Sequence, residues 1–128
     1  MTGPDWISLR ECHALHAAML ERFGGLEGVR DDGLHESALL RPQNLFSCDD
    51  TDLFAMAAAY ATGVIKNHPF LDGNKRIGFM TAHIFLGANG LSFQATEEEV
   101  VERTLALAAS AIDETEYAVW LKRVCVED

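Results

Sequence analysis

The stretch FAMAAAYATGVIKNHPFLDGNKRIGFMTAHIFL, residues 54–86, decides the fold of this chain. Its first part, 54–65, and its last part, 77–86, are apolar on almost every side when wound as helices. Helices without a polar face belong at the centre of a domain, so we expect two buried helices here. Neither is long enough to span a bilayer, which takes about 20 apolar residues. The polar residues between them therefore form a loop with rigid supports on both sides.

Capping signals divide the rest of the chain into further helices. Serine, threonine or aspartate followed three residues later by glutamate has the spacing of a capping box, and glycine or asparagine often ends a helix. The starting points of six expected helices are, in chain order, Ser8, Asp31–Asp32, Asp49–Thr51, Asn74, Thr96 and Asp113. The second is expected to stop before Pro42. Strand signals are confined to 91–93 and, more weakly, 43–48, so the sequence predicts an all-α fold.

The length and charge of the chain narrow its function. At 128 residues, with 48% hydrophobic and 23% charged residues, it is expected to form a single globular domain over 1–128. A net charge of −10 argues against broad binding to DNA or to an anionic membrane, because both need a basic face. Any phosphate group that the protein handles must therefore be bound locally.

The cysteines favour a cytoplasmic protein. Cys12, Cys48 and Cys125 are an odd number without CxxC spacing, which indicates reduced thiols. The N-terminus has no basic segment followed by an apolar run, so no signal peptide is expected. Cys12, His13 and His16 lie close together in the first helix, but no fourth ligand follows at a usual zinc spacing. Surface and packing roles are favoured for these three residues.

Two cations at an unusual place follow the loop that begins after Asn67. Lys75 and Arg76 fall in the first turn of the expected helix, where the helix dipole is positive and cations are unfavourable by a few tenths of a kcal/mol or more. A bound anion would remove this conflict, because backbone N–H groups and both side chains could then converge on it. Gly73 would let a large ligand approach the backbone. A phosphate chain fits best, since arginine grips phosphate oxygens with two hydrogen bonds.

Two further residues of the loop could supply chemistry. His68 can accept a proton at neutral pH, and Asp72 could bind Mg²⁺ together with substrate phosphates. A base, a metal carboxylate and an anion cradle are the parts needed to move a phosphoryl or nucleotidyl group to a hydroxyl. Taken one at a time, these residues also fit a turn, a helix cap or a solvated face. Lys66, just before the loop, fits either a surface role or a secondary contact to the ligand.

The segment HPFLDGNKR, 68–76, resembles the signature HxFx(D/E)(G/A)N(G/K)R of the Fic/Doc superfamily, and most closely its death-on-curing (Doc) toxins. The resemblance extends over most of the chain, including 21–43 and the helices on either side of the loop. It implies a compact helical bundle with a flap, here 43–48, that positions a target chain. It also implies roles for six residues: His68 as general base, Asp72 for Mg²⁺ and target alignment, and Gly73, Asn74, Lys75 and Arg76 as the phosphate cradle.

Departures within the motif bear on the reaction. Fic-type AMP transferases have glycine at the position of Lys75 and usually a second arginine at that of Phe79, whereas Doc toxins share the lysine and lack that arginine. The resemblance therefore implies a kinase-like transfer of the γ-phosphate of ATP to a protein hydroxyl, typically a threonine of translation elongation factor Tu, which arrests translation. Fic-type AMP transfer and a non-catalytic binding module are the alternatives.

The resemblance also implies a protein partner. Many Fic proteins carry an inhibitory helix, (S/T)xxxE(G/N), whose glutamate competes with the nucleotide. The nearest match, SAIDET at 110–115, lacks the final glycine or asparagine. Inhibition is therefore expected from a separate antitoxin that folds against this protein.

Overall fold

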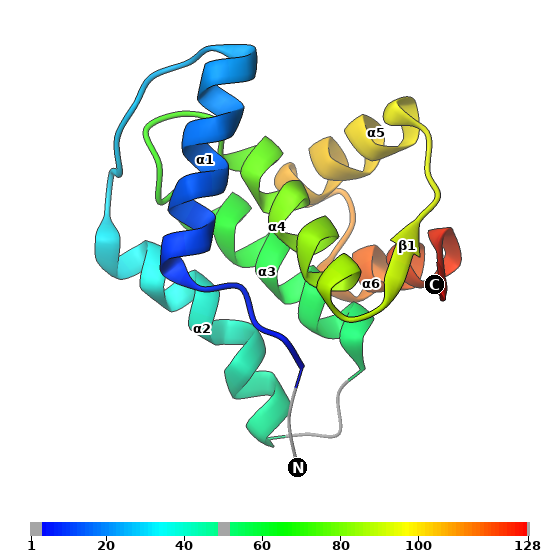
Figure 1. Ribbon diagram of the computed structural model, residues 1–128. Coiled ribbons are helices and arrows are strands. Elements are labelled where there is room, and N and C mark those ends of the chain that lie inside the picture. The colour runs from blue at the N-terminus through cyan, green and yellow to red at the C-terminus, as the bar shows by residue number, and fades with distance from the viewer. Residues whose placement is uncertain (1–3, 49–51, 128) are drawn as a thin grey trace.

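The computed structural model describes residues 4–48 and 52–127, most of which are helical (Figure 1). The elements within these residues are, in chain order, α1 (Leu9–Phe23), α2 (Asp32–Cys48), α3 (Leu53–Asn67), α4 (Asn74–Ala88), β1 (Leu91–Phe93), α5 (Glu97–Ala108), α6 (Glu114–Val124) and β2 (Cys125–Glu127). The predicted all-α fold is confirmed, with one small antiparallel sheet added to it. None of the described helices is long and apolar enough to cross a membrane.

Helices α3 and α4 form the centre of the bundle, as their apolar sequences predict. Helix α3 packs against α2, α4 and α6, whereas α1 and α5 contact α4 (Figure 1). The largest core side chains come from four parts of the chain: Tyr60, Phe70, Phe85, Tyr117 and Trp120. Phe70 belongs to the loop between α3 and α4. Full burial of such a side chain contributes about 1.5–3 kcal/mol, so the loop is anchored in the core by one of its own residues.

Most of the predicted helix starts are confirmed by their caps. Ser8 and Asp113 each form a full capping box with the glutamate three residues later. The Thr96 hydroxyl accepts a hydrogen bond from the first turn of α5. The predicted start of the third helix at Asp49–Thr51 lies outside the described residues, among which Asp52 caps α3.

The prediction that the second helix stops before Pro42 is wrong, because α2 continues through Pro42 to Cys48. A proline inside a helix costs about 3 kcal/mol, since it removes a hydrogen bond and crowds the preceding turn. Packing offsets this cost here: Pro42 and Ala38 are buried, and the rings of Phe46 and Trp6 meet edge to face, 5.7 Å apart. Most helix stability in proteins comes from such tertiary contacts, which a local signal does not contain.

The strand signal and the flap predicted at 43–48 are wrong for the same reason, since these residues form the last turns of α2. They lie at the opposite end of the bundle from the loop between α3 and α4 (Figure 1). The 15 residues of α3 separate the two places by about 22 Å. The segment 24–30, which we call the strap, runs beside the loop instead. One of its contacts is the hydrogen bond that the Leu71 N–H donates to the Gly28 carbonyl, 3.1 Å.

The strand predicted at 91–93 is confirmed as β1, but its partner β2 was not predicted. The two strands pair antiparallel, with Leu91 opposite Glu127 and Phe93 opposite Cys125. A three-residue segment that directly follows a helix has too little alternation to give a strand signal. The pairing depends on α6, which brings this segment beside β1.

Gly78 lies where α4 packs tightly against α3, so a larger residue there should lower stability. A Cβ added to Gly78 would lie 2.6 Å from Ile65 Cγ1 and 3.1 Å from the Ala61 carbonyl oxygen. We therefore expect Gly78→Ala to lower the free energy of unfolding by about 1–3 kcal/mol in chemical denaturation. Gly87→Ala on the same helix is the matched control, because nothing lies within 4 Å of its added Cβ. That variant should be unchanged or stabilised by about 0.5 kcal/mol, and equal losses in both would contradict the prediction.

Candidate active site

Two residues in left-handed conformation begin and end the loop between α3 and α4. His68 caps the C-terminus of α3 with φ 49° and ψ 56°. Gly73 precedes α4 with φ 81° and ψ 13°. The six residues 68–73 therefore form a short connection between two buried helices. The loop therefore stands on the rigid centre of the fold, as the sequence predicts.

The Asn74 side chain holds the backbone of this loop at Phe70. This buried side chain accepts a hydrogen bond from the Phe70 N–H, 3.0 Å, and donates one to the Phe70 carbonyl, 2.9 Å. The same amide nitrogen lies 3.5 Å from Nδ1 of His68. Asn74 thus ties the apolar anchor of the loop to the first turn of α4 and touches the histidine ring.

The loop surrounds a cavity of about 340 Å³. The six residues predicted for the site all line it, together with Leu71: His68, Asp72, Gly73, Asn74, Lys75 and Arg76. The structure therefore brings together on one surface the residues that could act as base, metal ligand and phosphate cradle. The cavity is open to solvent, since most of these side chains are exposed.

The electrostatics of the cavity favour an anion. Lys75 and Arg76 are exposed and form no ion pair with a carboxylate of the described residues, in which Arg41–Glu114 is the one ion pair. No side chain caps α4, because the capping position is Gly73. The positive end of the helix dipole and two unneutralised cations therefore face the same place. The Arg76 guanidinium lies over the Phe23 ring, 4.3 Å from its centroid, which limits its movement.

The Asp72 carboxylate accepts two backbone hydrogen bonds and can still bind a cation. One carboxylate oxygen accepts the Gly73 N–H, 2.9 Å, and the other accepts the Leu26 N–H of the strap, 3.2 Å. A carboxylate has about four acceptor sites, so each oxygen keeps one for a cation. The described residues contain no group of three His, Cys, Asp or Glu side chains that could hold a metal alone. A single exposed carboxylate fits Mg²⁺, which usually binds one or two carboxylates plus substrate phosphates.

Lys66 does not line the cavity. Its ammonium group donates hydrogen bonds to the Ala108 carbonyl, 3.1 Å, and to the Ser110 hydroxyl. It therefore caps the C-terminal end of α5. The 110–115 segment, which partly matches an inhibitory helix, forms the turn between α5 and α6 and the start of α6.

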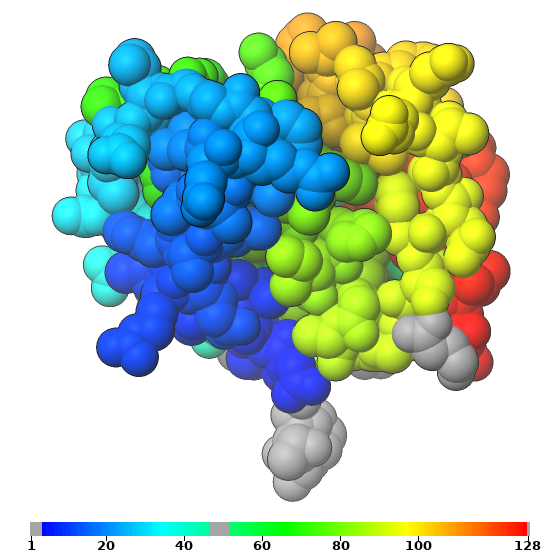
Figure 2. Space-filling view, turned by 45° about the horizontal axis from the view of Figure 1, so that its top comes forward, coloured from blue at the N-terminus to red at the C-terminus, as the bar shows by residue number. Residues whose placement is uncertain are grey.

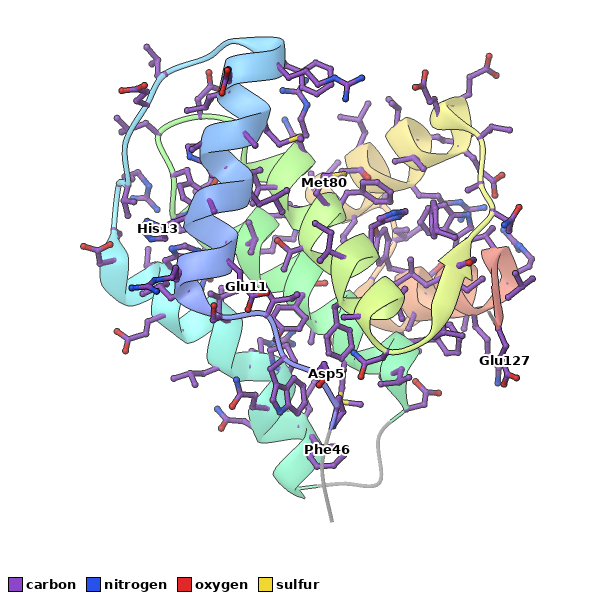
Figure 3. All side chains as sticks on the ribbon, in the orientation of Figure 1. Asp5, Glu11, His13, Phe46, Met80 and Glu127 are labelled. Atoms are coloured by element: carbon purple, nitrogen blue, oxygen red, sulfur yellow. The ribbon has the colours of Figure 1, made fainter. Side chains whose placement is uncertain are left out.

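A group of three histidines under the loop was not predicted to contact the site. His16 donates a hydrogen bond from Nε2 to the Asp72 carbonyl, 2.9 Å, and its ring stacks on Phe70 with centroids 3.8 Å apart. In Figure 3 His13 lies on the side of α1 that faces α2. Its ring stacks on that of the buried His35. The packing role predicted for His16 is confirmed. Its contact with the loop joins residues 56 positions apart, for which a local pattern gives no signal.

His35 makes the free energy of unfolding of the protein dependent on pH. Burial, followed by the charge of His13, lowers the pKa of His35 from 6.5 to about 4. Between these values the unfolded chain binds a proton that the folded protein does not, so stability is lost as the pH falls. We expect this group to contribute up to about 1.4 kcal/mol per pH unit, measured by chemical denaturation across the window. His35→Leu should flatten that part of the curve, and an unchanged slope would contradict the assignment.

Comparisons with known proteins show the family of this chain. Residues 6–86, which include the strap and the whole loop, match the Fic/DOC family. The chain is 34% identical over 119 residues to "Protein kinase doc" of Escherichia phage P1, which covers 92% of this chain and 94% of that protein. It is 40% identical over 75 residues to "Toxin Doc" of Mycolicibacterium smegmatis, which covers 57% and 58% of the two chains. The chain therefore belongs to the Fic/DOC family, and within that family it is similar to proteins named Doc.

Proposed function

We propose that the protein is a Doc-type toxin that transfers the γ-phosphate of ATP to a hydroxyl group of a protein. The proposed target is a threonine of translation elongation factor Tu, so that the modification arrests translation in the cytoplasm. The observation that carries the proposal is the cavity at the start of α4. There an exposed histidine and an exposed carboxylate share one surface with two cations that no carboxylate of the described residues neutralises.

His68 acts as the general base in this proposal. It takes the proton from the target hydroxyl as the hydroxyl oxygen forms a bond to the γ-phosphorus. The bond between that phosphorus and the bridging oxygen breaks, and ADP leaves. The Asn74 side chain lies beside the histidine ring, with its amide nitrogen 3.5 Å from Nδ1. A positioned base of this kind typically contributes about 10²- to 10⁴-fold to the rate.

Lys75, Arg76 and the backbone N–H groups of the first turn of α4 bind the phosphates. Arginine offers two parallel hydrogen bonds to phosphate oxygens, whereas lysine adds a compact charge. Both act on negative charge that spreads over the transferring group. Asp72 would hold Mg²⁺, which supplies neutralising charge to the phosphate oxygens when it is bound.

Lys75 and Phe79 support phosphate transfer over nucleotide transfer. Lys75 lies in the first turn of α4, where its side chain fills space that a glycine would leave open for the phosphate chain. Phe79 stands one turn later, and its ring packs edge to face on Phe93, 5.3 Å between centroids. An arginine in that place would add a cation for terminal phosphates, which this chain lacks there. The name "Protein kinase doc" of the phage relative points in the same direction.

The test uses two isotopic labels. Purified protein is incubated with elongation factor Tu, Mg²⁺ and ATP labelled at either the γ- or the α-phosphate. The proposal expects transfer of the γ-label only, and a mass increase of the factor by one phosphate group. Transfer of the α-label would overturn it in favour of AMP transfer. No transfer to any protein of a cell extract, with any of the four nucleoside triphosphates, would favour a non-catalytic binding module.

An apolar groove beside the cavity supports regulation by a separate antitoxin. It encloses about 570 Å³ between the end of α1, α4, β1 and α5, and it shares Lys75 and Arg76 with the cavity. In Figure 2 the end of α1 (blue) and helix α5 (yellow to orange) stand on either side of residues of α4 (green). An antitoxin helix could place apolar side chains there and a carboxylate at Arg76. It would then compete with the triphosphate.

One substitution on α5 tests the groove. Val101 lines it and is 55% exposed, so Val101→Asp should keep the fold but charge the surface that the antitoxin covers. We expect affinity for the product of an adjoining antitoxin-like gene to fall at least about 10-fold in calorimetry. Val119→Asp is the matched control, since Val119 is 61% exposed on α6 and does not line the groove. Equal affinity of Val101→Asp and wild type would place the antitoxin elsewhere.

A further inference from the structure

We propose that Arg30 is a positioning residue for His68. Its guanidinium holds the backbone carbonyls at the end of α3, and so keeps the histidine in the left-handed conformation in which its ring lines the cavity. The inference rests on the proposed role of His68 as the general base. The side-chain hydrogen bonds of Arg30 go to the backbone carbonyls of Asn67 and His68. Arg30 is not one of the residues that line the cavity.

The backbone of His68 needs such support. For an L-amino acid other than glycine, the left-handed conformation costs about 1–2 kcal/mol. Among the described residues, Ser110 is the other non-glycine residue with positive φ. The N–H of His68 is held, because it donates to the Val64 carbonyl at 3.2 Å. Its carbonyl, at the C-terminal end of α3, accepts a hydrogen bond from a group outside the helix.

Arg30 supplies that group. Its Nε donates to the His68 carbonyl at 2.7 Å, and one terminal nitrogen donates to the Asn67 carbonyl, also at 2.7 Å. The two N–H groups belong to one planar fork, so they fix the carbonyls of consecutive residues relative to each other. Both bonds are charge-assisted and lie at the negative end of the helix dipole, where a cation is favourable. A water molecule could donate a hydrogen bond to either carbonyl. Separate water molecules, however, would not fix the two carbonyls relative to each other.

The backbone of Arg30 is anchored to the same loop, so its side chain starts from a fixed point. The N–H groups of Arg30 and Asp31 both donate to the Pro69 carbonyl, at 2.6 and 3.1 Å. Val29, the preceding residue, forms an antiparallel bridge with Phe70. The Asp31 carboxylate caps the start of α2 through the Leu34 N–H, 2.9 Å. The end of the strap is thus bonded both to the loop and to the last residues of α3, next to His68.

The position of Arg30 predicts which kinetic constant it affects. Since it does not line the cavity, its loss should leave ATP binding nearly unchanged. Misplacement of the base lowers the rate of the chemical step, and a shift of about 1 Å can cost up to 10²-fold. We expect Arg30→Ala to lower kcat about 10- to 100-fold with the KM for ATP within about twofold. Arg30→Lys keeps the charge but not the fork, and should retain an intermediate kcat.

The experiment compares Arg30→Ala, Arg30→Lys and Arg30→Gln with Arg10→Ala, which removes an exposed arginine of α1. Steady-state kinetics and thermal unfolding are measured for each. Millimolar methylguanidinium is then added to Arg30→Ala, and partial recovery of kcat is expected, with no such effect on Arg10→Ala. Folded Arg30 variants with the kcat of wild type would overturn the proposal. So would variants in which the KM for ATP rises as much as kcat falls.

A second measurement reads the backbone of His68 without turnover. In protein labelled with ¹³C and ¹⁵N, the Cα shift and the H–N–Hα coupling of His68 report its φ angle. We expect both to move away from left-handed values in Arg30→Ala and to stay unchanged in Arg10→Ala. Unchanged His68 signals in folded Arg30→Ala and Arg30→Gln would overturn the proposal. If the wild-type protein transferred no phosphate, the function proposed above would fail, whereas this measurement would still decide the role of Arg30.

Discussion

His68→Asn is expected to lower phosphate transfer by about 10²- to 10⁴-fold, the usual contribution of a general base. Asparagine is chosen because it tolerates the left-handed conformation that His68 adopts, with φ 49° and ψ 56°. It can still form a hydrogen bond near Asn74, but it cannot accept the proton. The loss should appear in kcat, measured with γ-labelled ATP, and expression of the variant should no longer arrest growth.

The control for this prediction is the stability of the variant. His68 is exposed, so thermal unfolding of the variant should change little. His68→Ala should lose transfer to the same extent. It should also be slightly less stable, because alanine has to adopt the left-handed backbone. Retention of activity within about threefold in folded His68→Asn would exclude the histidine as the base.

Arg76→Ala is expected to lower kcat/KM for ATP by about 10²- to 10³-fold, the usual cost of removing a preorganised donor to developing charge. Its guanidinium is free of ion pairs with described carboxylates and lies at the uncapped start of α4. Loss of this group should also weaken nucleotide binding, so KM is expected to rise together with the fall in kcat. Transfer of the γ-label at several ATP concentrations separates the two effects.

Two variants control for the surroundings of Arg76. Arg76→Lys keeps the charge but loses the double hydrogen bond, so an intermediate activity is expected. Phe23→Ala removes the ring under the guanidinium, 4.3 Å away, and should cost less than about 1 kcal/mol of positioning. If Phe23→Ala were as inactive as Arg76→Ala, the stacked arrangement and not the cation itself would be the essential feature.

Local signals were sufficient for much of the fold. The capping boxes at Ser8 and Asp113 and the apolar faces of 54–65 and 77–86 predicted helices that the structure contains. These signals act within one or two turns, so no tertiary contact is needed to read them. The failures occur where packing overrides a local preference. Pro42 should end a helix, but burial of α2 against α3 and Trp6 carries the helix on to Cys48.

The sequence by itself was sufficient to identify the residues of the candidate site, because they are contiguous. Nine positions, 68–76, contain the candidate base, the carboxylate and both cations, and the two flanking helices are adjacent in the chain. Turn geometry alone therefore brings them to one cavity. The tertiary structure decided what holds the loop in place. Arg30 and His16 contact it from 38 and 56 positions away, at His68 and Asp72. Contacts over such separations depend on how α1, α2 and α3 pack, and a local pattern carries no record of that packing.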